Sequence, residues 1–301
     1  MVRYVTVGVD DSGESLAAAH WAAREALRRG AVLRLVHAVN WQSGASTAPM
    51  DTTRGRWAQQ ALEHAAGSVR AAHPGLQVEE LLLPDAPLTA LPAAAEVSEV
   101  LVLGSRGLGR LAGFVVGSVS QRVVARAARP VVLVRAGETL ADEHLPALDG
   151  VSPDEIPETP YRDVVLGLDP RHAHAELVEF AFEAARLRGA SLRVVHALGD
   201  APKHAADGRS GPVLGPELLA EREGLLGAAL RPWTEKFPEV PVSASVTPGQ
   251  AATELVRAAA RASLVVVGRR RRDTRLGTHI GPVVHAVLHH VGSPVAVVPH
   301  S

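Results

Sequence analysis

Short, uninterrupted runs of apolar residues alternate with longer amphipathic stretches along the chain. In the first half, the apolar runs are Val5–Val9, Val32–Val39, Leu81–Leu83, Val100–Leu103 and Val131–Val134. Strands that are apolar on both faces are typical of a parallel sheet that crossover helices cover on both sides. The pattern therefore predicts an α/β fold with the element order βαβαβαβαβ.

The second half of the chain repeats the first. Four segments recur, the first two after 159 residues and the last two after 164: Tyr4–Ser12 as Asp163–Arg171, Leu33–Ala38 as Leu192–Ala197, Val100–Gly104 as Leu264–Gly268, and Arg129–Val134 as Ser293–Val298. A period of this length is that of a whole domain and not of a short structural repeat. The chain is therefore predicted to hold two tandem domains, each with a five-stranded parallel sheet.

Residues 137–160 separate the two halves. This stretch, GETLADEHLPALDGVSPDEIPETP, is rich in proline and acidic residues and has no sustained apolar period. Such a composition is typical of a linker. The predicted domains are therefore residues 1–136 and residues 161–301.

Residues that cap helices mark the expected helix ends. Ser12 or Ser15 is expected to cap the first helix, and Gly30 and Gly189 follow corresponding helices in the two halves. The His-Pro-Gly sequence at positions 73–75 is expected to end the second helix of the first half.

Composition and charge exclude several classes of function. Lys and Arg number 31 against 32 Asp and Glu, so the net charge of -1 favours neither nucleic acid nor an anionic membrane as a partner. The absence of cysteine excludes disulfides, thiolate metal sites and cysteine nucleophiles. Because the sequence has no signal pattern and no apolar run of ~18–20 residues, we expect a soluble, cytoplasmic protein.

Lysine is almost absent from the chain. Only Lys203 and Lys236 are present, and neither follows a glycine-rich loop, so there is no Walker A motif. A receiver domain phosphorylated on aspartate needs a lysine after its last strand, where this chain has Arg135. Both functions are therefore disfavoured.

Polar residues follow the strands, where ligands bind in open parallel sheets. Asp10 follows the first strand, and Asp169 holds the same position in the second half. A carboxylate at this point either caps the next helix or accepts a hydrogen bond from a ribose hydroxyl or an adenine amine. His37 and His196 also end corresponding strands, which indicates a shared role in the sheet or in a ligand pocket.

A glycine-rich segment follows the fourth strand of the first half. Gly104, Gly107 and Gly117 let backbone N–H groups approach oxygen atoms closely, and Ser118 and Ser120 add hydroxyl groups at a helix start. Taken alone, the segment is either a phosphate cradle built without lysine or a flexible loop with an ordinary serine cap.

These residues resemble those of the universal stress proteins, whose nucleotide-binding members carry Gly-x2-Gly-x9-Gly-Ser/Thr after the fourth strand. Gly104, Gly107 and Gly117-Ser118 match that spacing, and the first, second and last strands of both halves also match. The resemblance implies Rossmann-like domains, similar to adenine-nucleotide α-hydrolases, that bind ATP, with the presence of Mg²⁺ left open. It implies contacts with the adenine or ribose from Val9, Asp10 and Ala38, and contacts with the phosphates from Gly104, Gly107, Gly117, Ser118, Val119 and Ser120.

The resemblance also implies how the two domains associate. Family members commonly dimerise by pairing their last strands antiparallel, and a tandem chain can form this pair internally. Val131–Arg135 and Val295–Pro299 are the expected partners in this pseudo-dimer. A homodimer of the whole chain and an unidentified protein partner are left open.

The second half departs from the family pattern. Arg271 stands in place of Gly107, Pro282 in place of Ser118 and Val284 in place of Ser120. Because proline lacks an N–H group and arginine does not reproduce a glycine turn, ATP binding of the family type is doubtful there. Two interpretations remain for the arginines at 269–272 and 275: a solvated loop, which we favour, or a phosphate site made of side chains.

The predicted function is that of a stress-response regulatory protein that binds ATP through its first domain with little or no turnover. No arrangement typical of covalent or acid–base catalysis can be placed, so no catalytic residue is predicted, and at most a weak ATPase is expected. His285 and His289 have a zinc-like spacing, but an ordinary pair on a packed helix is the simpler interpretation, and no metal site is predicted. The alternative function is a nucleotide-independent tandem scaffold that binds a protein partner.

Overall fold

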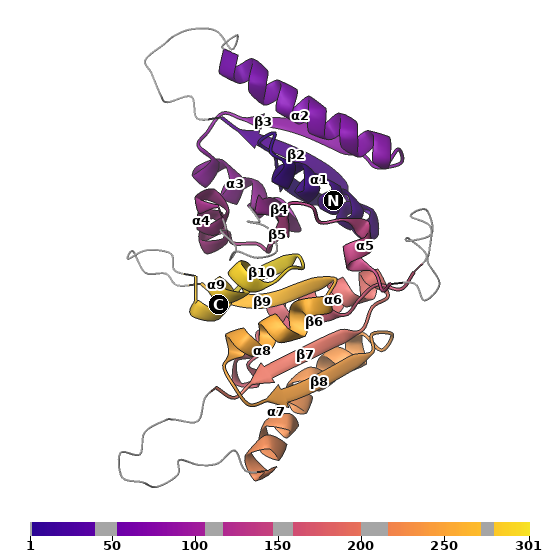
Figure 1. Ribbon diagram of the computed structural model, residues 1–301, viewed down its shortest axis with the longest axis vertical. Helices are drawn as coiled ribbons and strands as arrows, with labels where there is room; N and C mark the ends of the chain where they lie inside the picture. The colour runs from indigo at the N-terminus through magenta and orange to yellow at the C-terminus, as the bar shows by residue number, and fades with distance from the viewer. Residues whose placement is uncertain (1, 40–52, 106–116, 147–158, 200–215, 272–279) are drawn as a thin grey trace. The chain divides into compact units, whose positions relative to one another are not determined.

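The computed structural model describes residues 2–39, 53–105, 117–146, 159–199, 216–271 and 280–301 (Figure 1). These residues form two compact units, a first unit with strands β1 to β5 and a second unit with strands β6 to β10.

Five parallel strands form the sheet of the first unit: β1 (Tyr4–Gly8), β2 (Val32–Ala38), β3 (Val78–Leu83), β4 (Val100–Ser105) and β5 (Val131–Arg135). Their order is β3-β2-β1-β4-β5, so the strand order reverses between β1 and β4. The crossover helices are α1 (Gly13–Arg29), α2 (Thr53–Ala72), α3 (Pro87–Glu96) and α4 (Ser118–Arg126). Helix α1 contacts α2, and α3 contacts α4, which covers the sheet on both faces.

The second unit has the same topology. Its strands are β6 (Val164–Gly167), β7 (Leu192–Ala197), β8 (Val242–Thr247), β9 (Leu264–Arg270) and β10 (Val295–His300), all parallel in the order β10-β9-β6-β7-β8. The helices are α6 (Ala175–Arg188), α7 (Pro216–Lys236), α8 (Ala251–Ala258) and α9 (Pro282–His290), and 3-10 turns occupy Pro170–His172 and Ala259–Arg261. The prediction of two tandem Rossmann-like α/β domains with five-stranded parallel sheets is confirmed.

The apolar runs are buried because helices cover both faces of each sheet. Val5 and Val7 in β1 and Leu101 in β4 are fully buried, as are Leu166 in β6 and Val266 in β9. Strand β3 begins three residues earlier than the apolar run at 81–83 predicts, at Val78. It is an edge strand and every residue in it is partly exposed, so polar residues are tolerated there.

The expected caps are present. Ser12 is the N-cap of α1, and its hydroxyl accepts a hydrogen bond of 3.1 Å from the Ser15 N–H. Helix α1 ends at Gly30, whose φ of 57° is left-handed and therefore suits glycine. Gly189 has the same conformation after α6, and α2 ends at Ala72, immediately before the His-Pro-Gly stop signal.

Part of the segment predicted to be a linker is structured. Helix α5 (Leu140–Glu143) lies within it, and His144 forms an antiparallel bridge with Tyr161. His144 is buried, and its Nδ1–H donates to the Thr159 carbonyl oxygen over 2.6 Å. The two described ends of the segment therefore contact each other through His144 and Thr159. The domain limits themselves stay a prediction.

A buried ion pair lies at the end of α1. The Arg29 guanidinium is 2.7 Å from Glu25 and 3.2 Å from Glu99, and Glu25 is only 1% exposed. Arg28 also lies 3.2 Å from Glu25. Charges that are removed from water are costly unless they are paired. Loss of one charge from this cluster is therefore expected to destabilise the first unit.

Acid is expected to destabilise the protein below about pH 6.5. Burial lowers the pKa of five histidines below the ordinary value of 6.5: His20, His37, His73, His196 and His300. Between the native and the ordinary pKa, the unfolded chain binds more protons than the folded chain, so the free energy of unfolding rises with pH. This stability is complete above the ordinary value and is lost as the pH falls from there through the lower pKa that each histidine has in the folded chain.

Thermal unfolding at pH 7.5 and pH 5.5 measures this effect, since carboxylates are ionised at both values. The midpoint is expected to be lower at pH 5.5, and His20→Gln is expected to reduce the difference. His290→Gln is the control because that side chain is exposed. An unchanged midpoint between the two pH values would contradict the prediction.

Candidate functional site

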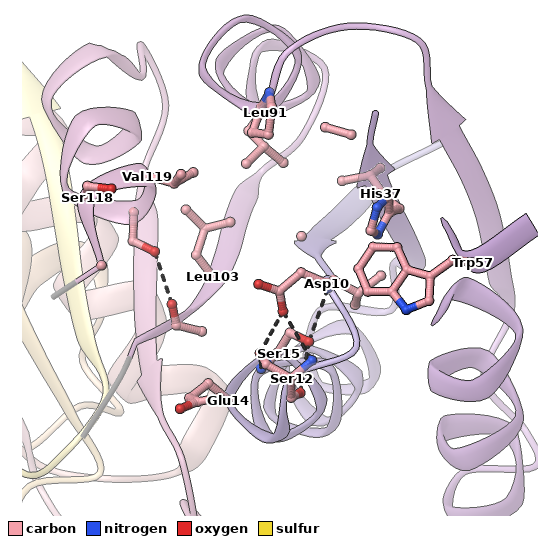
Figure 2. Close-up of a pocket in the computed structure, with 18 residues that line it drawn as sticks. Asp10, Ser12, Glu14, Ser15, His37, Trp57, Leu91, Leu103, Ser118 and Val119 are labelled. Atoms are coloured by element: carbon pink, nitrogen blue, oxygen red, sulfur yellow. Dashed lines mark hydrogen bonds between the residues drawn. The ribbon is translucent and has the colours of Figure 1, made fainter. Parts of the chain in front are cut away.

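The carboxyl ends of β1, β2 and β4 border a cavity of about 380 Å³ in the first unit (Figure 2). It lies where the strand order reverses, which is the ordinary place for a ligand in such sheets. The cavity is lined by Gly8, Val9, Asp10, Ser12, Glu14, Ser15, Val36, His37, Ala38, Trp57, Pro87, Leu91, Leu103, Gly104, Gly117, Ser118, Val119 and Ser120.

Asp10 lines this cavity, and its side chain is hydrogen-bonded to the start of α1. Its carboxylate accepts a hydrogen bond of 2.6 Å from the Ser12 hydroxyl, and its N–H donates to the Ser15 hydroxyl oxygen over 3.2 Å. Burial alone would raise the pKa of Asp10, but the hydrogen bonds with Ser12 and Ser15 outweigh it and hold the pKa below the ordinary value. Asp10 is therefore an ionised acceptor that remains exposed toward the cavity.

The start of α4 forms another wall. Gly117 is the N-cap, and no side chain caps the helix there. The first N–H groups of an α-helix have no acceptor within the helix, and the helix dipole places partial positive charge at this end. Ser118 and Val119 lie at this wall in Figure 2, so the helix presents N–H donors beside two exposed residues.

Ser120 fastens α4 to the sheet. Its hydroxyl donates to the Gly104 carbonyl oxygen over 3.0 Å, and the residue is buried. This hydroxyl proton is therefore engaged within the protein and is not free to be donated to a ligand. Ser120 therefore fixes the position of the helix start relative to β4.

The opposite wall is aromatic and apolar. The rings of His37 and Trp57 meet edge to face with their centroids 5.4 Å apart. Figure 2 shows this pair across the cavity from Ser118 and Val119, with Leu103 between them. Trp57 is 45% exposed, so it offers a ring face or edge to a bound molecule.

A family model of the universal stress protein family matches residues 1–135 and 160–299. The chain belongs to the universal stress protein family. A universal stress protein of Mycobacterium tuberculosis is 33% identical over 301 residues, which cover 97% of this chain and 96% of the relative. One from Mycolicibacterium smegmatis is 32% identical over 307 residues, which cover 98% and 96% of the two chains.

Solved structures support the same fold. The crystal structure of a universal stress protein from Archaeoglobus fulgidus has a TM-score of 0.69 at 17% identity and covers 99% of this chain and 98% of that one. A putative universal stress protein from Pseudomonas aeruginosa has a TM-score of 0.63 at 17% identity, covering 99% and 93%. Both matches span the two units, so the fold is shared over the whole length of the chain.

Most residues that the sequence singled out in this universal stress protein lie together. The residues that line the cavity are Val9, Asp10, Ala38, Gly104, Gly117, Ser118, Val119 and Ser120, whereas Gly107 lies outside the described residues. Their roles in binding stay predictions. The sequence does not indicate that Trp57, Ser12 or Ser15 belongs to the site, although the cap of α1 is a signal for the two serines.

The second unit of the universal stress protein carries the expected differences. Pro282 begins α9, and Val284 is buried behind it. The rings of His285 and His289 are 4.2 Å apart, and no group of three metal-ligating side chains occurs among the residues that the structure describes. None of the helices that the structure describes, in either unit, is long and apolar enough to cross a membrane.

Replacing Gly104 by alanine is expected to destabilise the first unit by about 1–3 kcal/mol, the usual cost of overpacking. A Cβ at Gly104 would lie 2.7 Å from the Glu14 carbonyl group, which is backbone and cannot rotate away. The start of α1, with its hydrogen bonds to Asp10, would have to move. Urea unfolding followed by circular dichroism measures the loss.

Gly268→Ala is the matched control in the second unit. A Cβ there would meet the ends of the Leu177 and His300 side chains at 2.9 Å, and side chains adjust more easily than backbone. A loss of stability in Gly268→Ala as large as in Gly104→Ala would show that the backbone contact is not the cause.

Proposed function

We propose that the first unit binds ATP in this cavity as a regulatory ligand, with little or no turnover, in a response to stress. The observation that carries the proposal is the arrangement of one cavity with an aromatic wall at His37 and Trp57 and an uncapped helix start at Gly117. Asp10 lies between these two walls (Figure 2). The arrangement suits a molecule that has a planar ring at one end and negative charge at the other.

The adenine would lie at the aromatic and apolar side. Val9, Ala38 and Leu91 provide apolar surface there, and Trp57 provides a ring for stacking or an edge contact. Asp10, held ionised by Ser12, would accept hydrogen bonds from a ribose hydroxyl or an adenine amine.

The phosphates would lie against the start of α4. Among the described residues that line the cavity there is neither lysine nor arginine, so within this part of the chain the attraction for phosphate would come from backbone N–H groups and the helix dipole. Gly117 leaves room for a close approach, since a Cβ there would meet no described atom within 4 Å. Mg²⁺ commonly binds through one or two carboxylates together with substrate phosphates, and Asp10 and Glu14 are the carboxylates at hand.

A regulatory role is proposed because the polar groups here hold the fold. Ser12 and Ser15 bond with Asp10, and Ser120 bonds with the Gly104 carbonyl, so these hydroxyl groups position the starts of α1 and α4. Pairing of the last strands of the two domains and a protein partner that receives the signal remain predictions.

Calorimetric titration of the full chain with ATP, with and without Mg²⁺, tests the proposal. One site per chain is expected, and the protein is first analysed for adenine nucleotide that has remained bound through purification. Absence of both heat and bound nucleotide would overturn the proposal and favour the nucleotide-independent scaffold. Two ATP sites would mean that arginine side chains of the second unit also hold phosphate.

A further inference from the structure

Helix α2 supplies part of the wall of the first cavity. It packs on β2, β3 and α1, and β3 is an edge strand of the sheet. Trp57, near the start of α2, lines the cavity beside His37 (Figure 2). The aromatic wall is therefore in place only while α2 is docked on the rest of the first unit.

The apolar contact that holds α2 is small. Most of its buried side chains are alanines: Ala58, Ala61, Leu62, Ala65, Ala66 and Val69. The stabilisation from burial grows with the apolar area removed from water, so an alanine contributes less than a larger side chain. A cavity of about 150 Å³ also separates the middle of α2 from the start of α1. Polar contacts therefore count for more here than they would at a tightly packed interface.

Histidines supply polar contacts between α1 and the far end of α2. The Nε2 atom of His20 in α1 lies 2.9 Å from the Ser68 hydroxyl oxygen in α2. The His20 ring is 6.3 Å, between centroids, from that of His73, which directly follows α2. Both histidines are partly buried, and the charge of Arg24, one turn further along α1, acts on both. Three basic side chains thus gather where the two helices touch.

The two rings are neutral while α2 is docked. Burial lowers the pKa of both below the ordinary value of 6.5. His73 and Arg24 lower that of His20 further, and Arg24 lowers that of His73. If α2 moved away from α1, both rings would return to water and toward the ordinary pKa, so the undocked form binds more protons. Acid therefore favours the undocked form as the pH falls below about 6.5.

Other charged contacts of α2 do not favour undocking in acid. Nδ1 of His64 lies 3.2 Å from the Asp11 carboxylate, and a protonated imidazole attracts a carboxylate more strongly than a neutral one. Arg70 lies 2.8 Å from Glu80 in β3, and both groups stay charged between pH 5.5 and pH 7.5. The acid response is therefore assigned to the histidine pair at the end of the helix.

The second unit has no histidine at the corresponding junction. At the spacings of the sequence repeat, 159 and 164 residues, Glu179 takes the place of His20 and Phe237 that of His73. Glu179 of α6 lies 2.5 Å from Lys236 of α7, whose ammonium group lies 5.3 Å from the centre of the Phe237 ring. Glutamate and lysine both stay charged between pH 5.5 and pH 7.5, so α7 serves as an internal control for α2.

We propose that α2 is an acid-sensitive wall of the first cavity: protonation of His20 and His73 releases α2 from α1, withdraws Trp57 and weakens nucleotide binding. The effect on the nucleotide rests on the proposed function, whereas the release of α2 rests on the interface between the two helices. The chain would thus hold its ligand at neutral pH and lose it as its surroundings become acidic.

Hydrogen–deuterium exchange of the ligand-free full chain at pH 7.5 and pH 5.5 tests the release of α2, with rates corrected for the intrinsic effect of pH on exchange. Protection of the α2 amides is expected to fall at least ~5-fold at pH 5.5, and that of α7 by less than ~2-fold. A variant with both His20→Gln and His73→Gln, which keeps hydrogen-bonding groups that do not titrate, is expected to retain the protection of α2. Unchanged protection of α2 in the unaltered chain, or an equal loss in the double variant, would overturn the proposal.

Calorimetric titration with ATP tests the effect on the cavity. The unaltered chain and the double variant are expected to bind ATP alike at pH 7.5, and the unaltered chain at least ~5-fold more weakly than the variant at pH 5.5. His37, on which the charges of Asp10 and Asp11 act, and the terminal phosphate of ATP also take up protons in acid. Both are present in either titration, so the comparison removes their contribution. Equal affinities at pH 5.5 would refute the link between α2 and the cavity.

Single variants guard against a double variant that does not fold. His73→Gln leaves the contact of His20 with Ser68 and is expected to remove part of the acid response. His64→Gln, on the same helix, is expected to keep the response in full, and its loss there would contradict the assignment to the pair. Failure of the proposed function is recognised separately, as absence of ATP binding by the unaltered chain at pH 7.5, and the exchange measurement does not depend on it.

Discussion

Replacing Gly117 by valine is expected to weaken ATP binding by the first unit at least ~100-fold, a loss of about 2.8 kcal/mol in binding free energy, while the chain stays folded. A Cβ at Gly117 meets no atom of the described residues within 4 Å, and the φ of -56° and ψ of 144° suit any residue. The valine methyl groups would therefore occupy the cavity wall without a clash. They would hold a phosphate away from the first N–H groups of α4.

Gly281→Val is the matched control. Gly281 is the N-cap of α9, and its Cβ position is equally open, but it does not line the first cavity. In calorimetric titration, this variant is expected to bind ATP with the same affinity as the unaltered chain. If Gly117→Val bound ATP as tightly as Gly281→Val, the start of α4 would not be the phosphate site.

Replacing Glu25 by glutamine is expected to give the largest loss of stability among single polar substitutions in the first unit. Removing one partner of a buried ion pair costs about 3–5 kcal/mol, because the other charge remains in a poorly solvated place. Glu99 stays 3.2 Å from the Arg29 guanidinium, so we expect a value near 3 kcal/mol. Urea unfolding of the full chain, followed by circular dichroism, measures the loss.

Glu80→Gln is the comparison for the ion pair. Glu80 lies 2.8 Å from Arg70, whose side chain is 50% exposed, and such surface pairs contribute less than about 1 kcal/mol. A further variant, Glu25→Gln with Arg29→Leu, removes the buried charge itself and is expected to recover part of the stability. Equal effects of Glu25→Gln and Glu80→Gln would show that burial does not strengthen the pair.

The central strands were predictable from the sequence, and the edge strands less so. Strands β1 and β4 are covered on both faces and flanked by strands on both sides, so nearly every residue is apolar and the pattern is unmistakable. Edge strands such as β3 and β8 have partly exposed residues and carry Glu79, Glu80 and two serines. Their chemistry resembles that of loops, so apolar runs alone locate them poorly.

The cavity was predictable only as far as local sequence determines it. Asp10 and the glycines at 104 and 117 follow strands or begin helices, and parallel strands bring such positions to one edge. Trp57 comes from the beginning of α2, whose approach to His37 depends on tertiary packing. The same holds for the contact of Gly104 with Glu14, since nothing in the local sequence specifies which helix lies against that glycine.

The two sheets do not interleave along the chain. All five strands of the first unit lie before residue 136, and every strand of the second lies after residue 163. During synthesis, the first sheet can therefore form while the ribosome is still producing the second half. Neighbouring domains of one fold are prone to exchange strands when they fold together, so this order of emergence protects a tandem protein from misassembly.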